Sequence, residues 1–224
     1  MKDWKFIFEK WVLLRHRSGF YEPKVKRRLR QLKGELFVDI GANQGLYSIS
    51  LAKRFRQIYA FEPDPSVVPL LSKKLREKGI KNVRIFQTAL GDRVGNTILY
   101  LDHHAGFSGS LNTIMPVFTY KPEQIPSGGS ARIYIGKSGV EVPISTYDTI
   151  ITEQADLVKI DVEGAEFLVL NGMKNALQQQ RIKRLIVELH DKDRKRDLED
   201  MLSGYDLEWV DQDHLLGSLS ESRG

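Results

Sequence analysis

The sequence predicts an α/β fold in which helices cover both faces of a mostly parallel sheet. From residue 35 onward, short apolar runs alternate with amphipathic segments, and such alternation is typical of parallel strands joined by helical crossovers. Several apolar runs end in an acidic residue, as expected where parallel strands present polar groups at one rim. The last two runs, 205–210 and 214–219, are separated by a short polar turn, which predicts an antiparallel hairpin at the end of the sheet.

The composition is typical of a single globular domain. The chain has 224 residues, of which 41% are hydrophobic and 28% charged, and this length is enough for one substantial core. It contains no cysteine, so disulfides, thiol nucleophiles and cysteine-ligated zinc are excluded. No apolar stretch approaches the roughly 18 to 20 residues that cross a bilayer, and the charged N-terminus is unlike a secretory signal. We therefore expect a cytoplasmic protein.

Residues 1–34 are expected to form an N-terminal helical extension of the domain at 35–224. Trp4, Phe8 and Trp11 recur at three- to four-residue spacing, and Pro23 breaks the segment. The helix is expected to pack on the core or over the site. Peripheral contact with a membrane is the alternative, because aromatic side chains opposite Lys and Arg suit lipid headgroups.

Within the domain, the expected strands and helices follow one another in the order of a crossover fold. Apolar runs predict strands at 35–40, 57–62, 82–90, 155–161 and 184–190. Amphipathic segments predict helices near 46–54, 66–78 and 193–203, and another from about 165. Each crossover between parallel strands is expected to be right-handed.

A loop-rich insertion at about 102–140 interrupts this order. Gly, Ser and Pro crowd together there, between short possible strands at 97–101, 131–135 and 140–144. A long irregular insertion in a compact domain is typical of a lid or a binding loop. We therefore expect substrate contacts in this region.

Polar side chains follow four of the expected strands. Asp39 follows the first strand, Glu62 the second and Asp161 the fourth, while Glu188 and His190 lie at the end of the fifth. Because the carboxyl ends of parallel strands share one rim, these groups are expected to converge on a ligand where the strand order reverses.

The turn after Asp39 indicates the kind of ligand. Gly41 and Gly45 allow close backbone approach, and Glu62 lies 23 residues after Asp39, near the spacing of an acid that binds a ribose. A dinucleotide site is disfavoured because Asn43 replaces the glycine that admits the pyrophosphate, and because Asp39 would repel that group. The pattern favours S-adenosylmethionine, which carries a ribose, an ammonium and a sulfonium but no phosphate.

Four motifs together resemble the FkbM-type methyltransferases, a branch of the class I S-adenosylmethionine-dependent enzymes. They are "VDIGANQGLYS", "AFEPDP", "TALGD" and "LVKIDVEGAEFLVLNGM", and the likeness runs from about residue 35 to 191. The resemblance implies a Rossmann-like three-layer αβα sandwich with a seven-stranded sheet and an antiparallel C-terminal hairpin. It also implies O-methylation of a hydroxyl on a sugar, glycan or secondary-metabolite-like small molecule.

The matching motifs imply where the cofactor lies. The methionine part is expected beside the glycine turn, formed by Asp39, Gly41, Ala42, Asn43 and Gly45. The ribose hydroxyls are expected at Glu62. The adenine is expected near Ala89 and Leu90, with Asp92 as a further candidate that could instead bond its own turn, and the transferring methyl near Asp161.

Transfer to a hydroxyl requires a group that takes or weakens its proton. Asp161, Glu163, Glu188 and His190 are the candidates, and we expect His190 to act as the base while Asp161 and Glu163 position the acceptor. Glu188 is two residues from His190 and could orient its ring. Alternatively, His190 bonds backbone, Glu163 is an acid favoured at a helix start, or Asp161, Glu188 and His190 share a divalent cation such as Mg²⁺ or Mn²⁺.

The basic charge of the chain leaves other functions open. The net charge is +5, and basic residues gather at 24–33 and 192–197, either as a solvated helix face or as a phosphate-binding track. The first alternative is therefore an RNA methyltransferase, although the sequence has no recognisable RNA-binding module. The second is a non-catalytic S-adenosylmethionine-binding module. No pattern predicts the oligomeric state.

Overall fold

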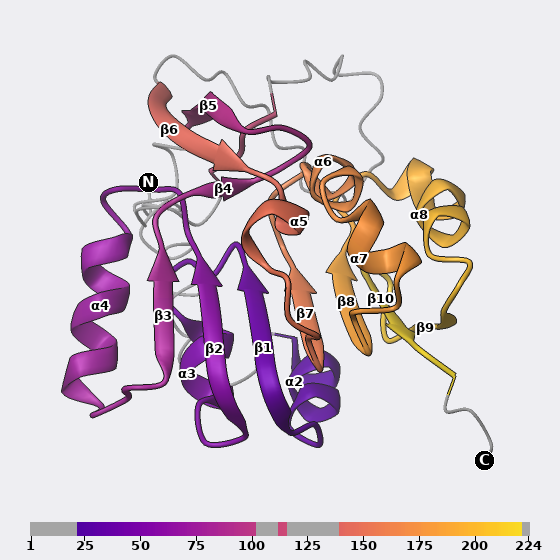
Figure 1. Ribbon diagram of the computed structural model, residues 1–224, viewed down its shortest axis with the longest axis horizontal. Helices are drawn as coiled ribbons and strands as arrows, with labels where there is room; N and C mark the ends of the chain where they lie inside the picture. The colour runs from indigo at the N-terminus through magenta and orange to yellow at the C-terminus, as the bar shows by residue number, and fades with distance from the viewer. Residues whose placement is uncertain (1–21, 102–111, 116–138, 221–224) are drawn as a thin grey trace, which may run out of the picture.

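The computed structural model describes residues 22–101, 112–115 and 139–220, which form a seven-stranded sheet, a smaller three-stranded sheet and the helices around them (Figure 1). The strand order of the large sheet is β3-β2-β1-β7-β8-β10-β9. Its strands are β1 (Gly34–Ile40), β2 (Phe55–Phe61), β3 (Val83–Phe86), β7 (Leu157–Ile160), β8 (Arg184–Glu188), β9 (Asp206–Trp209) and β10 (His214–Ser218).

The topology of the large sheet places its reversal point at β1. The chain moves outward from β1 through β2 to β3, then returns to the other side of β1 with β7 and continues to β8, all in parallel. β10 runs antiparallel to both β8 and β9, which confirms the predicted C-terminal hairpin. Ligands of such sheets bind beyond the carboxyl ends of the strands beside the reversal point.

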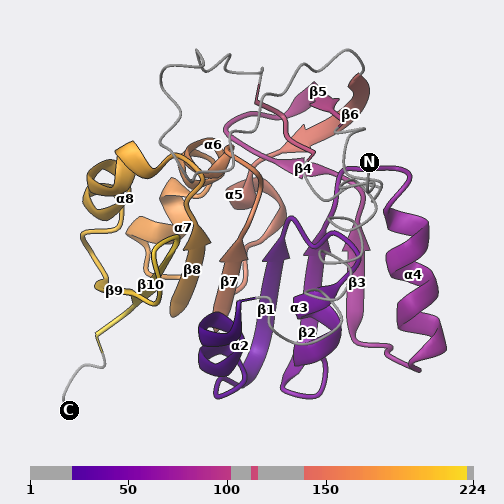
Figure 2. The same ribbon diagram turned by 180° about the vertical axis from the view of Figure 1, so that it is seen from behind.

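Side chains alternate between two faces of the sheet, and helices cover both. Phe37 packs with α2 (Pro23–Leu29) and α3 (Leu46–Leu51), which lie in front of the sheet in Figure 2. Val38 and Ile40 pack on the opposite face. The helices of that face are α5 (Tyr147–Ile150), α6 (Glu166–Asn171), α7 (Lys174–Gln178) and α8 (Lys195–Met201), which follows the 3₁₀ turn η2 (Lys192–Arg194).

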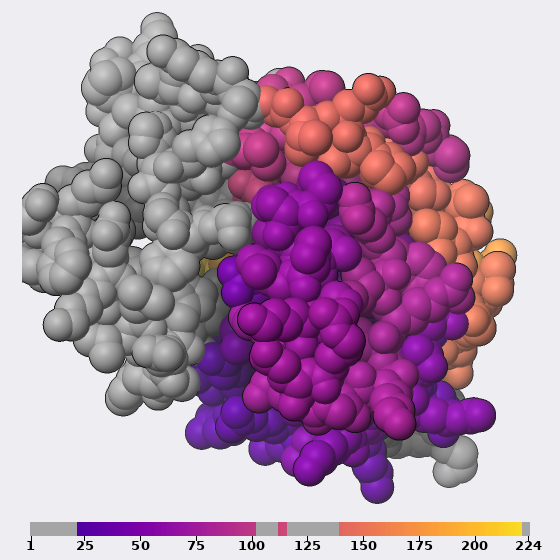
Figure 3. Space-filling model, turned by 90° about the vertical axis from the view of Figure 1, so that its left-hand side faces the viewer, coloured from indigo at the N-terminus to yellow at the C-terminus, as the bar shows by residue number. Residues whose placement is uncertain are grey.

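α4 (Val68–Glu77) completes the first of these faces. Its buried residues, Leu71 and Leu75, pack with Ala60 of β2, which is two residues from Ile58 and so points to the same side. Figure 3 shows the molecule from the side of α4, where magenta residues form a continuous surface below the salmon residues of the smaller sheet.

The predicted strand at 82–90 is divided between the two sheets. β3 ends at Phe86, and β4 (Ala89–Leu90) pairs with β6 (Gly139–Ser145), which also pairs with β5 (Gly95–Tyr100). The smaller sheet therefore has the order β4-β6-β5 and lies above the carboxyl ends of the large sheet in Figure 1. The possible strand at 131–135 and most of the insertion fall outside the described residues.

The helix predicted from about residue 165 is also divided, into α6 and α7. At the break, a Cβ added to Gly172 would lie 1.8 Å from the carbonyl oxygen of Gly91, so this backbone contact requires a glycine. The two helices thereby hold the turn after β4 close to the large sheet.

At the N-terminal end, Pro23 lies in the first turn of α2, a position that tolerates proline because its missing N–H has no partner within the helix. α2 buries Val25 and Leu29, four residues apart, and Lys24, Arg27 and Arg28 are exposed. The aromatic helix predicted before Pro23 falls outside the described residues. No helix in the described ranges is both long enough and apolar enough to cross a membrane.

Candidate functional site

The turn after β1 lies directly against the end of β7. Gly41, Asn43 and Gly45 have positive φ angles of 79°, 48° and 85°. A Cβ added to Gly41 would lie 1.8 Å from the carbonyl oxygen of Asp161, and one added to Gly45 would lie 2.4 Å from a side-chain carbon of Leu71. The turn therefore requires glycine at both positions, because each combines a left-handed backbone with close contact. Between them, Ala42 is buried.

Asp39 joins the end of β1 to the start of α3. Its Oδ2 accepts hydrogen bonds from the backbone N–H of Ser48 at 3.0 Å and from the Ser48 hydroxyl at 2.6 Å. Burial raises the pKa of Asp39, whereas these bonds and the charge of Lys159 favour the ionised form. The carboxylate is thus held at the rim, and Ser48 is a partner that the sequence patterns did not predict.

Glu62 holds the turn after β1 to the turn after β2. Its Oε2 accepts from the backbone N–H of Asn43 at 2.8 Å, and its Oε1 accepts from the backbone N–H of Asp64 at 2.9 Å. Burial raises the pKa of Glu62 to about 7. Because a carboxylate offers about four lone-pair positions, both oxygens retain capacity for further donors such as ribose hydroxyls.

The residues predicted near the adenine have different surroundings. Ala89 and Leu90 are buried in β4. Asp92 is instead partly exposed, and its Oδ1 lies 3.5 Å from a guanidinium nitrogen of Arg93. The buried pair therefore forms part of the wall above the sheet, and Asp92 lies at its surface.

The two-residue period of the strands gathers polar side chains on the face covered by α2 and α3. Asp39 of β1 is the register neighbour of Lys159 on β7, and Glu188 of β8 is the neighbour of His214 on β10. Two residues away along the same strands, this face is apolar: Phe37, Leu157, Ile186 and Leu216. The polar row therefore lies at the carboxyl ends of the parallel strands, where the core ends.

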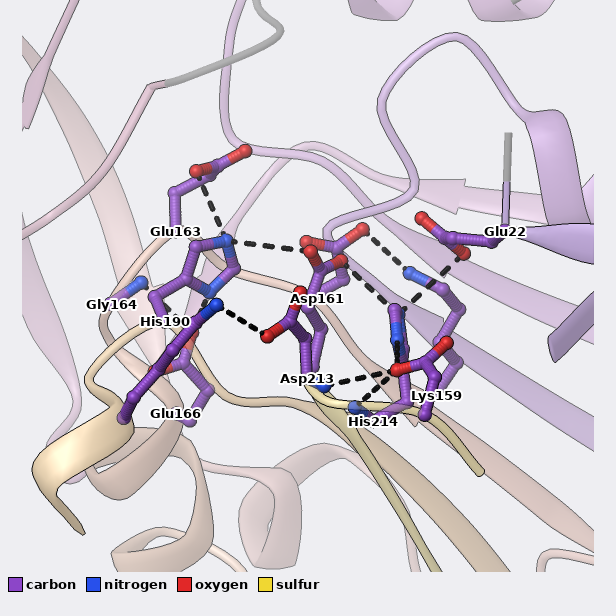
Figure 4. A network of polar contacts seen from close by, with 12 residues as sticks. Glu22, Lys159, Asp161, Glu163, Gly164, Glu166, His190, Asp213 and His214 are labelled. Atoms are coloured by element: carbon purple, nitrogen blue, oxygen red, sulfur yellow. Dashed lines mark hydrogen bonds and ion pairs between the residues drawn. The ribbon is translucent and has the colours of Figure 1, made fainter. Parts of the chain in front are cut away.

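Lys159 is the buried cation of this row. Its Nζ donates to Asp161 Oδ2 at 2.7 Å (Figure 4). The same Nζ lies 4.8 Å from the centre of the Tyr47 ring. Burial alone would lower the pKa of Lys159, but the charge of Asp161 and other carboxylates outweighs burial and raises it. Burial likewise opposes ionisation of Asp161, but the Lys159 ammonium lowers the pKa of that carboxyl to about 2. The two groups therefore form an ion pair.

His190 lies among three carboxylates. Its Nδ1 is 2.8 Å from Glu166 Oε1, and its Nε2 is 3.1 Å from Glu163 Oε2 (Figure 4). The same Nε2 is 3.9 Å from Glu188 Oε1. Burial alone would lower the pKa of His190, but hydrogen bonds to Glu163 and Glu166 raise it to about 11. A protonated imidazole has no lone pair to accept a proton, so this arrangement speaks against the base role predicted for His190.

Glu166 is a site residue that the sequence patterns did not single out. It is fully buried at the start of α6, where its Oε1 also accepts from the backbone N–H of Gly164 at 2.8 Å. Its spacing to Val169, Leu170 and Met173 is that of the buried helix face. An acid on an otherwise apolar helix face is the signal that could have identified it.

Glu188 connects the acidic residues around His190 to the polar row of the strands. Burial, and then the charge of Asp161, raise the pKa of Glu188 to about 7. Asp161, Glu188 and His190 can offer ligand atoms within 4.8 Å of one another, as the predicted shared cation requires. Both ring nitrogens of His190 already face carboxylates, however, so a cation there would have to displace Glu163 or Glu166.

An open cavity of about 410 Å³ lies beside the smaller sheet. Its lining combines polar and apolar side chains of β5 and nearby segments: Arg93, Asn96, Thr97, Ile98, Tyr100, Ile114 and Leu168. Ile114 belongs to the described part of the insertion, and the neighbouring Asn112 donates to Asp64 Oδ2 at 2.6 Å. The described residues 112–115 of the insertion thus contact both the cavity and the turn after β2.

Comparison with known sequences gives one family and several methyltransferases. Residues 39–213 match the profile of the methyltransferase FkbM domain. The hexuronic acid methyltransferase AglP of Haloferax volcanii is 27% identical over 181 residues, which cover 73% of this chain and 65% of that protein. The methyltransferase sdnD of Sordaria araneosa is 30% identical over 156 residues, which cover 61% of this chain and 59% of that protein. The chain thus spans less than two thirds of these relatives.

Solved structures confirm the Rossmann-like architecture. The methyltransferase FkbM from Methylobacillus flagellatus superimposes with a TM-score of 0.55 at 18% identity, covering 83% of this chain and 43% of that one. Magnesium protoporphyrin IX methyltransferase from Synechocystis, solved with bound SAM, gives a TM-score of 0.51 at 13% identity, covering 93% of this chain and 81% of that one. At these identities the likeness concerns the fold.

Proposed function

The chain belongs to the FkbM family of methyltransferases, and we propose that it transfers a methyl group from S-adenosylmethionine to a hydroxyl of a sugar, glycan or similar small molecule. The observation that carries the proposal is the rim at the strand reversal. There the turn at 41–45 lies against Asp161, with Asp39 and Glu62 beside it. The acceptor class is supported by the hexuronic acid methyltransferase among the relatives.

The rim suits a cationic cofactor better than a phosphate-bearing one. Asp39 is buried at the rim, and Asp161 is held ionised, so together they favour a ligand with an ammonium and a sulfonium. In our proposal the turn at 41–45 binds the methionine part, and Glu62 accepts hydrogen bonds from the ribose hydroxyls. Ala89 and Leu90 contact the adenine.

In our proposal Glu163 is the base that accepts the proton of the acceptor hydroxyl. The reaction breaks the bond between sulfur and methyl and forms a bond between methyl and oxygen, so S-adenosylhomocysteine leaves and the hydroxyl proton must move to a base. Glu163 is a carboxylate at the rim, and His190, charged between Glu163 and Glu166, positions it. Glu188 supports His190 from the sheet. Alignment of the reactants by such groups can supply roughly 7 to 11 kcal/mol.

The acceptor is expected in the cavity beside β5. Asn96, Thr97 and Tyr100 provide hydrogen-bonding groups for a polyhydroxy ligand, and Arg93 could pair with a carboxylate. Leu168, on the first helix after Glu163, belongs to the same lining, and this connection supports the choice of the cavity as the acceptor site.

Calorimetric titration with S-adenosylhomocysteine tests the cofactor, with NAD as the comparison ligand. We expect binding of S-adenosylhomocysteine alone, and loss of that binding in Glu62→Ala. Glu35→Ala is the matched control, because Glu35 is an exposed acid near the other end of β1 and its loss should leave affinity unchanged. Binding of NAD instead, or equal affinity in Glu62→Ala and wild type, would contradict the proposal.

Turnover assays with candidate acceptors test the base. Glu163→Gln should lower kcat by about 10²-fold or more while S-adenosylhomocysteine still binds, as expected for removal of a general base. Glu77→Gln, at an exposed position on α4, serves as the control. Wild-type turnover in Glu163→Gln would exclude this role. Retention of the protein on RNA that weakens steeply with salt would favour the RNA alternative.

A further inference from the structure

A second cluster of buried polar groups lies next to the rim, where three distant parts of the chain meet. Glu22 directly precedes α2, Glu188 ends β8 and His214 begins β10, in register with Glu188. Their side chains are only 8%, 19% and 5% exposed, respectively. Each can offer one ligand atom, and these atoms all lie within 4.8 Å of one another. Figure 4 shows Glu22 and His214 of this cluster side by side.

The ring of His214 is oriented by a carboxylate. Its Nδ1 lies 2.8 Å from Asp211 Oδ1, and the same oxygen accepts from the backbone N–H of His214 at 2.9 Å. A carboxylate at Nδ1 keeps a proton there and directs Nε2 toward the other two ligands. Burial alone would lower the pKa of His214, but the carboxylates of Glu188, Glu22 and Asp211 raise it to about 9, so a metal ion would bind Nε2 in place of a proton. Imidazoles that bind metals in proteins almost always have such a partner on their other nitrogen.

Three buried side-chain atoms of this cluster make no hydrogen bonds. His214 Nε2, Glu188 Oε2 and Glu22 Oε1 are all buried without a hydrogen-bond partner. His214 Nε2 lies 3.5 Å from Glu188 Oε2 and 3.7 Å from Glu22 Oε2. Since buried polar groups are nearly always hydrogen-bonded, three such atoms in one cluster require an explanation.

The separations match those between ligands of one metal ion. An N–H···O hydrogen bond would bring nitrogen and oxygen to about 2.9 Å. Bonds of about 2.1 Å to a tetrahedral ion instead place neighbouring ligand atoms about 3.4 Å apart. We therefore infer that Glu22, Glu188 and His214 bind a divalent transition-metal ion, for which two carboxylates and one imidazole are a suitable ligand set.

The alternative cation site around His190 is less suitable. There, both ring nitrogens lie within 3.1 Å of carboxylate oxygens, so neither is available to a metal. At His214 only Nδ1 has a partner at hydrogen-bond distance. Lys159 is a nearby positive charge that Glu22 and Glu188 also attract, but the hydrogen bond of its Nζ goes to Asp161.

The ion would fix the segment before α2 to the end of the sheet. Glu22 also accepts a hydrogen bond from the hydroxyl of Tyr47 on α3. The metal ion and this hydroxyl would therefore hold the Glu22 side chain from two directions. Glu188 and His214 belong to paired strands and already lie side by side. The role is structural, and it does not depend on the proposed methyl transfer.

Titration of the chelator-treated full-length protein with Co²⁺ tests this site, because four-coordinate Co²⁺ has a strong visible absorption. We expect one equivalent to bind with that absorption. His214→Gln and Glu22→Gln should remove it, and Asp211→Asn should weaken affinity by about 10- to 100-fold as the loss of an orienting carboxylate does. His190→Gln is the matched control and should bind Co²⁺ like wild type.

The outcomes separate this site from its rivals. Absence of stoichiometric binding in wild type would overturn the inference, and so would binding that survives His214→Gln, since the other histidines would then hold the metal. Loss in His190→Gln but not in His214→Gln would move the ion to the Asp161 cluster. Glu22→Gln keeps the test valid if His214→Gln fails to fold, because Glu22 lies outside the helices and strands of the sheet.

Discussion

Replacement of Lys159 by methionine tests the electrostatics of the rim. Lys159 is 2% exposed, and its Nζ lies 2.7 Å from Asp161 Oδ2. Methionine keeps the unbranched apolar stem beside Tyr47 but removes the ammonium, so that Asp161 loses its cation in a buried setting. Breaking a buried ion pair in this way typically costs about 3 to 5 kcal/mol. For a domain of this size, each 1 kcal/mol lowers the melting temperature by about 2 to 4 °C.

Lys183 provides the matched comparison, because it forms the same kind of pair in an exposed place. Its Nζ lies 2.6 Å from Asp156 Oδ1, but its side chain is 46% exposed. Exposed pairs contribute about 0 to 1 kcal/mol, since water screens the charges and the free lysine is well solvated. Lys183→Met should therefore lower the free energy of unfolding far less than Lys159→Met, although the two pairs have nearly equal lengths.

Urea unfolding of both variants at several pH values measures the difference. The loss in Lys159→Met should be largest near neutral pH and should shrink in acid, because protonation of Asp161 removes the uncompensated charge. Lys183→Met should show no comparable trend. Equal losses in the two variants, or a loss in Lys159→Met that does not depend on pH, would refute the view that burial makes the Lys159 pair strong.

Two further perturbations examine the cofactor edge, the rim formed by Asp39, the turn at 41–45, Glu62 and Asp161. Burial raises the pKa of Glu62 from 4.5 to about 7, so the folded protein binds this proton more tightly than the unfolded chain does. The free energy of unfolding should therefore fall by about 3 kcal/mol as the pH rises from 4.5 to 7. Urea unfolding of Glu62→Gln should lack this part of the slope, and an identical slope would contradict it. Gly41→Ala should unfold at lower urea and lose S-adenosylhomocysteine binding in calorimetry, because its Cβ would clash with Asp161. Gly79 also has a positive φ, but a Cβ added there would meet no atom within 4 Å. Gly79→Ala should therefore cost only about 1 kcal/mol of left-handed backbone strain and keep S-adenosylhomocysteine binding. Equal effects of the two substitutions would refute the clash at Gly41.

The order of the elements could be predicted because it depends on local patterns. Apolar runs alternating with amphipathic segments predicted the parallel strands, and the polar turn before His214 predicted the final antiparallel hairpin. The division at Gly172 could not be foreseen, because its cause is contact with Gly91, 81 residues earlier in the chain. Long-range backbone contacts of this kind leave only an isolated glycine as a signal.

The site shows the same division between local and long-range causes. Asp39, Glu62 and Asp161 could be predicted because each follows a strand, and the rim common to parallel strands brings them together. Lys159 and His214 were missed because their significance depends on register. Lys159 becomes a partner of Asp39 only through the pairing of β7 with β1, and His214 reaches Glu188 only because β10 inserts antiparallel beside β8.

His190 shows why a position in the sequence does not give a charge state. Its position after β8 predicted a place at the rim, and the imidazole was expected to act as a neutral base. Its charge state depends on Glu166, which comes from the start of α6 and lies 2.8 Å from Nδ1. A second carboxylate, Glu163, is held on the other side by the loop after β7. Two acids on opposite sides favour the imidazolium, and in the proposed mechanism this imidazolium orients the carboxylate of Glu163.

Lys159 makes the cofactor edge and the cluster at His214 interdependent. Its ammonium donates to Asp161, and its charge is also attracted by Asp39 on the cofactor side and by Glu22 and Glu188 on the other. A metal ion at Glu22 and Glu188 would neutralise those carboxylates and leave the ammonium more completely to Asp39 and Asp161. The cofactor edge would then offer less negative charge to a sulfonium. Binding at the two places should therefore be mutually weakening, and linkage requires the effect to be equal in both directions.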